Sequence, residues 1–202
     1  MSDQKAKVKS YVRRRLESWQ HEPNPHQIRA DLANLRRGIG KAPGDLPELW
    51  GLLFRDFPEE LMSSTGEPTW AEWAVSGALT LYALHQQGAQ RSMHADGQRL
   101  GMAIWGLARN DADRLKADRL KAVQRRFNAF ATARSMPECL HHLRGLIQLL
   151  RSEDIPLDYV ELAGDLYEFQ TPDGAARVRL RWGQDFYRNA FRTEQGKDDD
   201  HA

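Results

Sequence analysis

The sequence predicts an all-α fold: a helical bundle of about eight or nine helices. Apolar residues recur three and four positions apart along almost the whole chain, which is the period of a helix rather than of a strand. Proline, glycine and capping residues divide this pattern into segments of helical length. The 202 residues, 41% of them hydrophobic, are enough for one domain with a substantial core. We expect a single helical domain over residues 1–192, with an N-terminal lobe (1–109) packed on a C-terminal lobe (110–192) as the alternative.

Four helices are expected in the N-terminal half. The first carries an apolar stripe and ends before the breaker sequence HEPNP. The second begins where Asn24 precedes Pro25, an N-cap followed by proline in the first turn. A short helix starts at Asp45. A fourth follows Thr69, which forms the capping-box pattern with Glu72.

The C-terminal half is expected to contain the remaining helices. One lies around residues 97–109, and Asn110 is placed to cap the next. Further helices are predicted to open near Ser135, near Pro156 and near Thr171, each followed by apolar residues at helical spacing.

Composition excludes several classes of protein. No apolar stretch approaches the roughly 20 residues that a membrane-spanning helix needs. The N-terminus has no apolar segment typical of a secretory signal, and the single cysteine, Cys139, leaves no internal disulfide. We therefore expect a cytoplasmic protein without a membrane partner. The acidic tail, residues 193–202, is expected to be disordered.

No motif indicates catalysis, a metal or a cofactor. The Gly38–Lys41 sequence GIGK lacks the first glycine and the Ser or Thr of a phosphate loop. His141 and His142 are adjacent, so on a helix they point about 100° apart and cannot share a metal ion. Cys139 lies near an apolar helix face and is expected in the core. We expect no enzyme activity, no catalytic residue, no metal and no cofactor.

Charge alternates along the chain although the net charge is only +1. Residues 1–41 carry ten basic and four acidic groups, and residues 99–151 carry eleven basic and four acidic groups. Acidic groups prevail in residues 42–70, with six against one basic group, and in residues 152–202, with twelve against six. A fold that brings the two basic blocks together would form a face that attracts polyanions.

Arginines on the predicted outer faces of helices are the candidate nucleic-acid contacts. Guanidinium groups spaced one to two helical turns apart can follow a phosphate backbone, and Arg144 and Arg151 have this spacing. Ordinary solvated arginines paired within the chain are the alternative. The candidates on helices are Arg36, Arg37, Arg125, Arg144 and Arg151, together with Arg126 at the boundary of a core face. Arg99, in the second basic block, and Arg134, in the turn between two predicted helices, are further candidates.

Tryptophans could instead stack on unpaired bases. However, Trp19, Trp50, Trp73 and Trp182 lie at or beside core positions of their helices, so core packing is the preferred interpretation. This favours contacts to the nucleic-acid backbone over readout of bases.

The order of several motifs resembles one known family. LANLRRGIGKAPGDLPELWGLLF, RRFNAFATARS and LHHLRGLIQLLRSE follow one another along the chain. In this order they resemble CasB, the small helical subunit of the type I-E CRISPR complex Cascade, over roughly residues 11–192. The matching positions are Arg37 in LRRG, the pair at 125 and 126 before FNA, Arg134, and Arg144 in LRG.

The resemblance implies a non-catalytic subunit that contacts the guide RNA and the target DNA and stabilises the displaced non-target strand in antiviral defence. It also implies packing on the backbone subunits, the large subunit and a second copy. Two other functions stay open on the residues alone. One is a purely structural helical adaptor whose basic and acidic blocks meet those of neighbours. The other is a small helix-turn-helix-like DNA-binding regulator.

Overall fold

The computed structural model describes residues 2–109 and 116–198 of the chain. Within these ranges it contains nine α-helices, two short 3-10 helices and no strand, which confirms the all-α prediction. The elements are α1 (Ser2–Gln20), α2 (Pro25–Arg37), η1 (Pro47–Leu49), α3 (Trp50–Leu53), η2 (Glu59–Leu61), α4 (Trp70–His85), α5 (Leu100–Arg109), α6 (Lys116–Ala131), α7 (Met136–Ser152), α8 (Tyr159–Phe169) and α9 (Gly174–Asp198).

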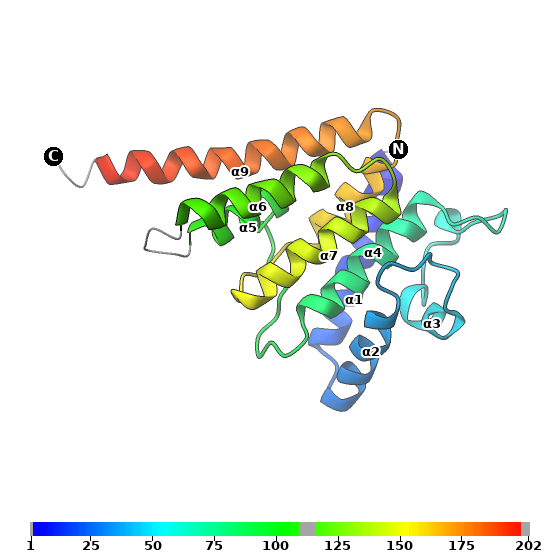
Figure 1. Cartoon of the computed structure of the whole chain (residues 1–202). Coiled ribbons are helices and arrows are strands. Elements are labelled where there is room, and N and C mark those ends of the chain that lie inside the picture. The colour runs from blue at the N-terminus through cyan, green and yellow to red at the C-terminus, as the bar shows by residue number, and fades with distance from the viewer. Residues whose placement is uncertain (1, 110–115, 199–202) are drawn as a thin grey trace.

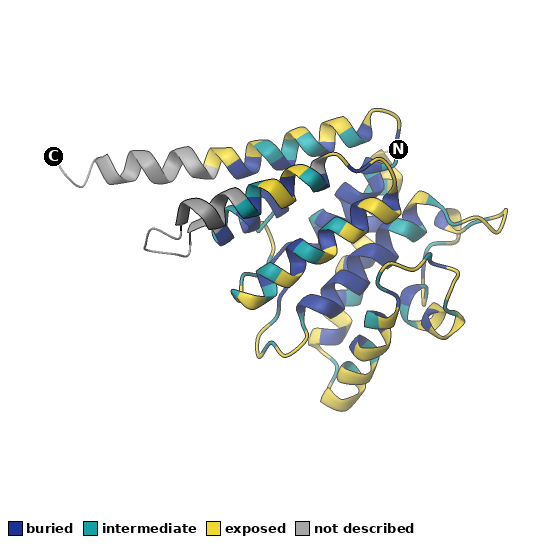
Figure 2. Cartoon of the chain, viewed as in Figure 1, coloured by how far each residue is buried: buried dark blue, intermediate teal, exposed yellow. Residues whose placement is uncertain are grey.

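Helix α4 is the central element of the fold. It contacts α1, α2, α7 and α8, and these four helices surround it (Figure 1). Every residue from Ala74 to His85 is buried, and Figure 2 shows α4 dark blue over most of its length. Its sequence has small and apolar residues on all sides, as a helix buried all round requires.

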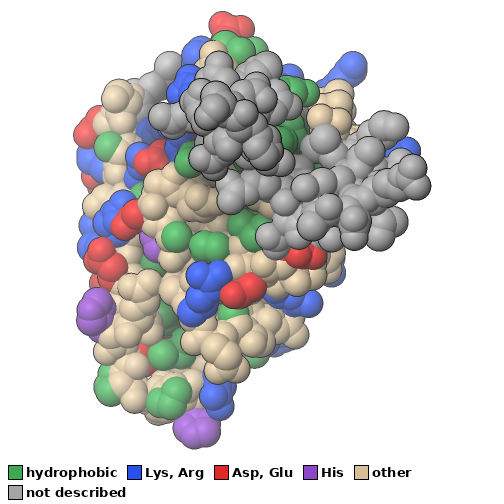
Figure 3. Space-filling model, turned by 90° about the vertical axis from the view of Figure 1, so that its left-hand side faces the viewer, with side chains coloured by type: hydrophobic (Ala, Val, Ile, Leu, Met, Phe, Trp, Pro, Cys, Tyr) green, Lys and Arg blue, Asp and Glu red, His purple; other side chains and the backbone are tan. Residues whose placement is uncertain are grey.

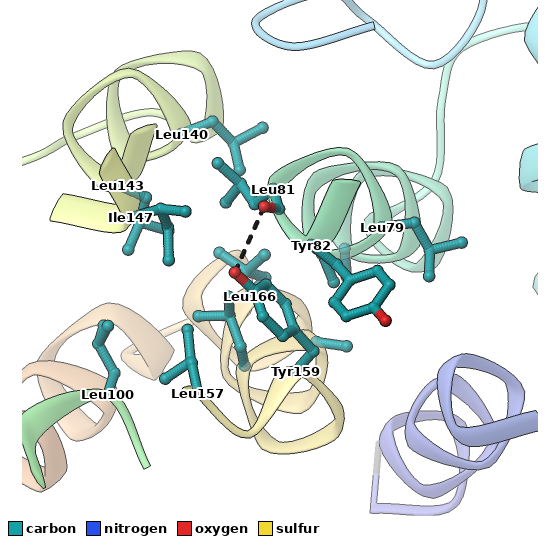
Figure 4. Packing of buried hydrophobic residues seen from close by; sticks show 14 of the residues in the cluster. Leu79, Leu81, Tyr82, Leu100, Leu140, Leu143, Ile147, Leu157, Tyr159 and Leu166 are labelled. Atoms are coloured by element: carbon teal, nitrogen blue, oxygen red, sulfur yellow. Dashed lines mark hydrogen bonds between the residues drawn. The ribbon is translucent and has the colours of Figure 1, made fainter. Parts of the chain in front are cut away.

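The core is continuous from α4 into α7 and α8. Leucines of α7 and α8 enclose α4, and Tyr159 enters this cluster from the start of α8 (Figure 4). The Tyr159 hydroxyl donates to the Leu81 carbonyl oxygen at 3.3 Å and lies 2.9 Å from Nδ1 of His85. The polar tip of this fully buried ring is therefore satisfied inside the apolar core.

Helices α5, α6 and α9 form the upper part of the molecule in Figure 1. α9 packs along α5, and α6 lies against α5 and α7. Helices on either side of the possible lobe boundary at residues 109 and 110 also pack together, since α8 contacts both α1 and α4. We therefore propose that residues 1–192 form one helical domain, as first expected, rather than two lobes.

The predicted starts of α2, α4 and α7 agree with the structure, and each of these helices is capped by a side chain just before its first residue. The side chain of Asn24 accepts hydrogen bonds from the backbone at the start of α2. Thr69 and Glu72 form the complete capping box of α4, and Ser135 caps α7. These caps satisfy amides that have no partner inside the helix.

Three predicted helix starts were displaced. Asp45 does not begin a helix, because its carboxylate accepts the Ala42 amide at 2.9 Å, and the first helical turn is η1. α8 begins after Asp158, which caps it, rather than at Pro156. α9 begins at Gly174, after Asp173 adopts a positive φ of 56°.

Two predictions reach beyond the described residues. Asn110, placed as a helix cap, lies outside them. The predicted disordered tail falls partly outside them, at 199–202, while α9 continues to Asp198.

Candidate nucleic-acid interface

Two of the predicted arginines meet at the C-terminal end of α4. Arg36 of α2 donates to the Ala83 carbonyl oxygen at 3.4 Å. Arg151 of α7 donates to the Leu84 carbonyl oxygen at 3.5 Å and to Oε1 of Gln87 at 2.8 Å. The last carbonyls of a helix lack intrahelical partners and carry partial negative charge, so cations are stabilised there.

The two guanidinium groups also influence each other. Burial lowers the pKa of Arg36, and the positive charge of Arg151 lowers it further. Like charges are therefore close together at this end of α4, and the helix carbonyls compensate them only in part. An anion placed between α2 and α7 would relieve the remaining repulsion.

A hollow of about 620 Å³ borders Arg36, between α2 and the loop that follows α4. Arg29 and Arg36 both line it, together with glutamines and apolar residues: Pro25, Ile28, Leu32, Gln86, Gln87, Gly88, Ala89 and Gln90. Arg29 is a candidate that the sequence-based prediction missed. Its seven-residue spacing from Arg36, two turns on one flank of α2, was the signal that could have found it.

Arg144 extends the basic surface along α7. It is exposed and lies seven residues before Arg151, about 10 Å along the same flank of the helix. Gln148 between them is also exposed. Spacing predicts one polar stripe of His141, Arg144, Gln148 and Arg151; the first three are exposed, and Arg151 is half-buried.

A second group of arginines lies on α6 and on the turn before α7. Arg125, Arg126 and Arg134 are all exposed. The side chains of these three residues and of Arg144 make no hydrogen bond or ion pair within the described part of the chain. α6 packs against α7, so the four residues belong to neighbouring helices. Among the predicted candidates, these four are the ones whose side chains have no partner in the described part of the chain.

The other two candidates have acidic partners. Arg37 is exposed and pairs with Glu48 at 2.9 Å, an exposed ion pair that stabilises the fold by less than about 1 kcal/mol. Arg99 pairs with the buried Asp185 at 2.5 Å in a cleft between α5 and α9, and this hydrogen bond raises the pKa of Arg99. The structure thus gives Arg99 a structural partner and places it apart from the arginines at the end of α4.

Charges elsewhere on the molecule are more evenly mixed. On the face shown in Figure 3, Lys and Arg side chains lie beside Asp and Glu side chains along one edge. Near the N-terminus, Lys5 and Lys9 pair with Glu168 and Glu161, each at 2.5 Å. Such faces attract a polyanion less than a surface whose arginine side chains are not paired with carboxylates.

One cluster contains potential metal ligands. His94, Asp96 and Asp158 bring ligand atoms within 4.8 Å of one another. However, Nδ1 of His94 accepts the Tyr159 amide at 3.2 Å, so its proton is on Nε2 in the neutral ring. Asp158 accepts three backbone amides, including that of Gly97 at 2.7 Å. The cluster thus ties the loop before α5 to the start of α8.

The single thiol is unsuited to nucleophilic chemistry. Cys139 is fully buried on α7, as expected, and burial raises its pKa to about 12. The reactive thiolate is therefore scarce at neutral pH.

Comparison with known proteins identifies the family. Residues 31–187 match the family described as CRISPR-associated protein Cse2. The chain belongs to the Cse2, or CasB, family of the type I-E Cascade complex. This confirms the resemblance seen in the sequence. No curated protein sequence matches the chain.

Two solved structures of this family have the same fold. CasB from Thermobifida fusca is 35% identical, with a TM-score of 0.69, and the match covers 91% of this chain and 97% of that protein. CasB from M. ruber is 24% identical, with a TM-score of 0.66, and the match covers 91% and 96% of the two chains.

Members of the Cse2 family are structural subunits of Cascade. Other components of that complex are therefore expected neighbours of this protein. Across the described ranges, no helix is both long and apolar enough to cross a lipid bilayer.

Proposed function

We propose that this Cse2-family subunit binds nucleic acid within Cascade and stabilises the R-loop by holding the displaced non-target strand. The observation that carries the proposal is a group of four exposed arginines on α6, α7 and their connecting turn whose side chains form no ion pair with the residues that the structure describes: Arg125, Arg126, Arg134 and Arg144. Family membership supports it, since Cascade is a CRISPR assembly that contains this family.

The energetics of strand exchange explain how such a surface would act. Replacing a DNA duplex by an RNA–DNA heteroduplex is nearly balanced in free energy, so modest contacts with the sugar-phosphate backbone can shift the equilibrium. Arginines that hold the displaced strand would oppose re-annealing. Because phosphates carry no sequence information, the contact is independent of sequence, and guide pairing supplies specificity.

The candidates divide into two groups by their contacts within the fold. Arg36 and Arg151 are half-buried and engaged with α4, so they would contribute charge at the edge of the surface rather than free side chains. Arg99 is committed to Asp185. We therefore propose the four unpaired arginines as the principal contacts, with Arg37 available because its exposed ion pair is weak.

The test is the lifetime of an R-loop formed by the reconstituted complex on a matched DNA duplex. The variant combines Arg125→Glu, Arg126→Glu and Arg144→Glu, three exposed positions whose change leaves the core intact. We expect the variant to assemble normally and the R-loop to dissociate at least tenfold faster. Loss of three single-strand phosphate contacts should also lower the slope of log affinity against log salt by about 2.

A matched control carries the same change of charge at exposed basic residues elsewhere: Arg14→Glu, Lys41→Glu and Arg55→Glu. If the two variants shorten the lifetime equally, net charge rather than this surface is responsible. An unchanged lifetime in the first variant would favour the purely structural adaptor. Strong preference of the isolated protein for one DNA sequence would favour a helix-turn-helix-like regulator.

A further inference from the structure

The connection between α2 and α4 exposes large apolar side chains. Trp50 is 50% exposed, Met62 is 43% exposed and Trp70 is 41% exposed. The sequence predicted Trp50 in the core, and the structure shows this to be wrong, because α3 is a single turn whose inward side is filled by Leu53. Clustered exposed aromatics of this size are typical of binding surfaces.

Two hollows lie side by side in this region and share Pro68 as a common wall. The first, of about 220 Å³, is lined by Trp50 and Phe54 among others. The second, of about 290 Å³, is lined by Trp70 and Tyr167 among others, and these two rings pack edge to face with their centroids 6.3 Å apart. Both are below the usual size of small-molecule sites, so they suit inserted side chains of a polypeptide better than a free ligand.

Hydrogen bonds hold the walls of these hollows in place. Glu72 accepts the Thr69 amide at 2.7 Å and the Ser63 amide at 3.1 Å. The Thr69 hydroxyl donates to the Leu61 carbonyl oxygen at 2.8 Å. The capping box of α4 therefore also fixes the loop that carries Pro68. A site organised before binding loses less conformational entropy when a partner docks.

The surroundings of the hollows are acidic. Residues 42–70 contain six acidic side chains and one basic side chain, Arg55. Glu48 and Glu60 pair with Arg37 and Lys7, whereas Asp56, Glu59 and Glu67 are exposed at the surface. Negative potential here repels a phosphate backbone and attracts lysine and arginine.

We propose that these two hollows, together with their acidic surroundings, are the docking site for a basic segment of another protein subunit of the complex. Two apolar side chains of that segment would fill the hollows beside Trp50 and Trp70. Its lysines or arginines would lie over the exposed indole rings and near Glu59 and Glu67, where cation–π and charge attraction act together. Complementary charge selects this occupant over nucleic acid.

This inference rests on the family assignment and is independent of the proposed nucleic-acid surface. Trp50 and Trp70 lie on the connection between α2 and α4 and at the first residue of α4, whereas the four proposed arginines lie on α6, α7 and the turn between them. Loss of docking and loss of strand binding should therefore be separable by mutation.

The test is photo-crosslinking within the reconstituted full complex. Benzoylphenylalanine replaces Met62, which lies between Leu61 and Ser63 on the hollow walls and leaves both tryptophans intact. We expect crosslinks to one peptide of another subunit that carries a net positive charge. Combining the probe with Trp50→Ser should reduce this crosslink at least fivefold.

A second variant and a control position keep the result unambiguous. Glu59→Lys with Glu67→Lys, two exposed surface changes, should also reduce the crosslink at least fivefold while the subunit stays folded. A probe at Leu180 on α9, which is 63% exposed, should be unaffected by either variant. Crosslinks from position 62 to nucleic acid, to a second copy of this chain or to no partner would overturn the proposal, whatever the R-loop lifetime of the arginine variant.

Discussion

Glu168 on α8 holds the N-terminal helix against the start of α9. Its carboxylate accepts hydrogen bonds from Lys5 at 2.5 Å, from Arg177 at 3.1 Å and from Arg181 at 2.9 Å. Burial alone would raise the pKa of Glu168, but the three cationic donors outweigh it and lower the pKa to about 2. The side chain is only 15% exposed, so solvent screens these interactions weakly.

This pKa predicts a stability contribution with a defined pH dependence. Lowering the pKa from 4.5 to about 2 corresponds to about 3 kcal/mol of unfolding free energy, at about 1.4 kcal/mol per pH unit. As the pH falls, the unfolded chain takes up the proton first. The stabilisation is therefore complete above about pH 5 and is lost as the pH falls towards 2.

The assay is urea unfolding of the full chain followed by circular dichroism at pH 7, 5 and 3.5. We expect Glu168→Gln to lower the unfolding free energy by about 3 kcal/mol at pH 7, and by progressively less as the pH falls. Glu161→Gln is the matched control on the same helix, because Glu161 forms a single, more exposed pair with Lys9 and should lose under about 1 kcal/mol. A Glu168→Gln deficit that is absent at pH 7, or that does not change with pH, would refute the reasoning.

Three further outcomes are expected. Gly101→Ala should lower the unfolding free energy measured in urea by about 2 kcal/mol, because a Cβ at this position would overlap the Trp182 carbonyl oxygen. Gly183→Ala is the control: a Cβ there meets no atom within 4 Å, so the change should be neutral or stabilising by up to about 1 kcal/mol. Native Cys139 should resist a thiol reagent at pH 8 and react only as fast as the chain unfolds, since burial raises its pKa to about 12. Burial lowers the pKa of His85 from 6.5 to about 4, so as the pH falls the unfolded chain is protonated at His85 before the folded chain is. The unfolding free energy should therefore fall by about 3 kcal/mol between pH 6.5 and 4. His85→Gln should remove this part of the pH dependence.

The fold could be predicted because its main signals are local. Helical spacing of apolar residues identified the helices, and Asn24, Thr69 and Ser135 cap within three residues of their own position. The start of α8 was missed because a long-range contact determines it. The Leu157 amide donates to the Met93 carbonyl oxygen at 3.0 Å, which keeps the residues after Pro156 extended. No pattern within one segment contains that information.

The candidate site could be predicted only in part. Spacing on a helix shows that a side chain points outward, and Arg125 and Arg144 are exposed as predicted. Arg126, predicted at the boundary of a core face, is exposed as well. Spacing cannot show which arginine finds a partner elsewhere in the fold. Arg99 binds Asp185, which lies 86 positions away in sequence.

The central position of α4 explains why arginines from different helices come together. A helix buried on all sides must end inside the protein or at its surface with several carbonyls unpaired. The helices that flank α4 reach its C-terminal end with Arg36 on α2 and Arg151 on α7, and both side chains bind these carbonyls. Satisfying the end of α4 therefore concentrates positive charge at one edge of the molecule, and Arg144 continues it along α7. By the same geometry, the N-terminal end of α4 gathers an acidic, aromatic loop around its capping box. This one buried helix thus has two arginines bound at its C-terminal end and an acidic, aromatic loop fixed at its N-terminal end.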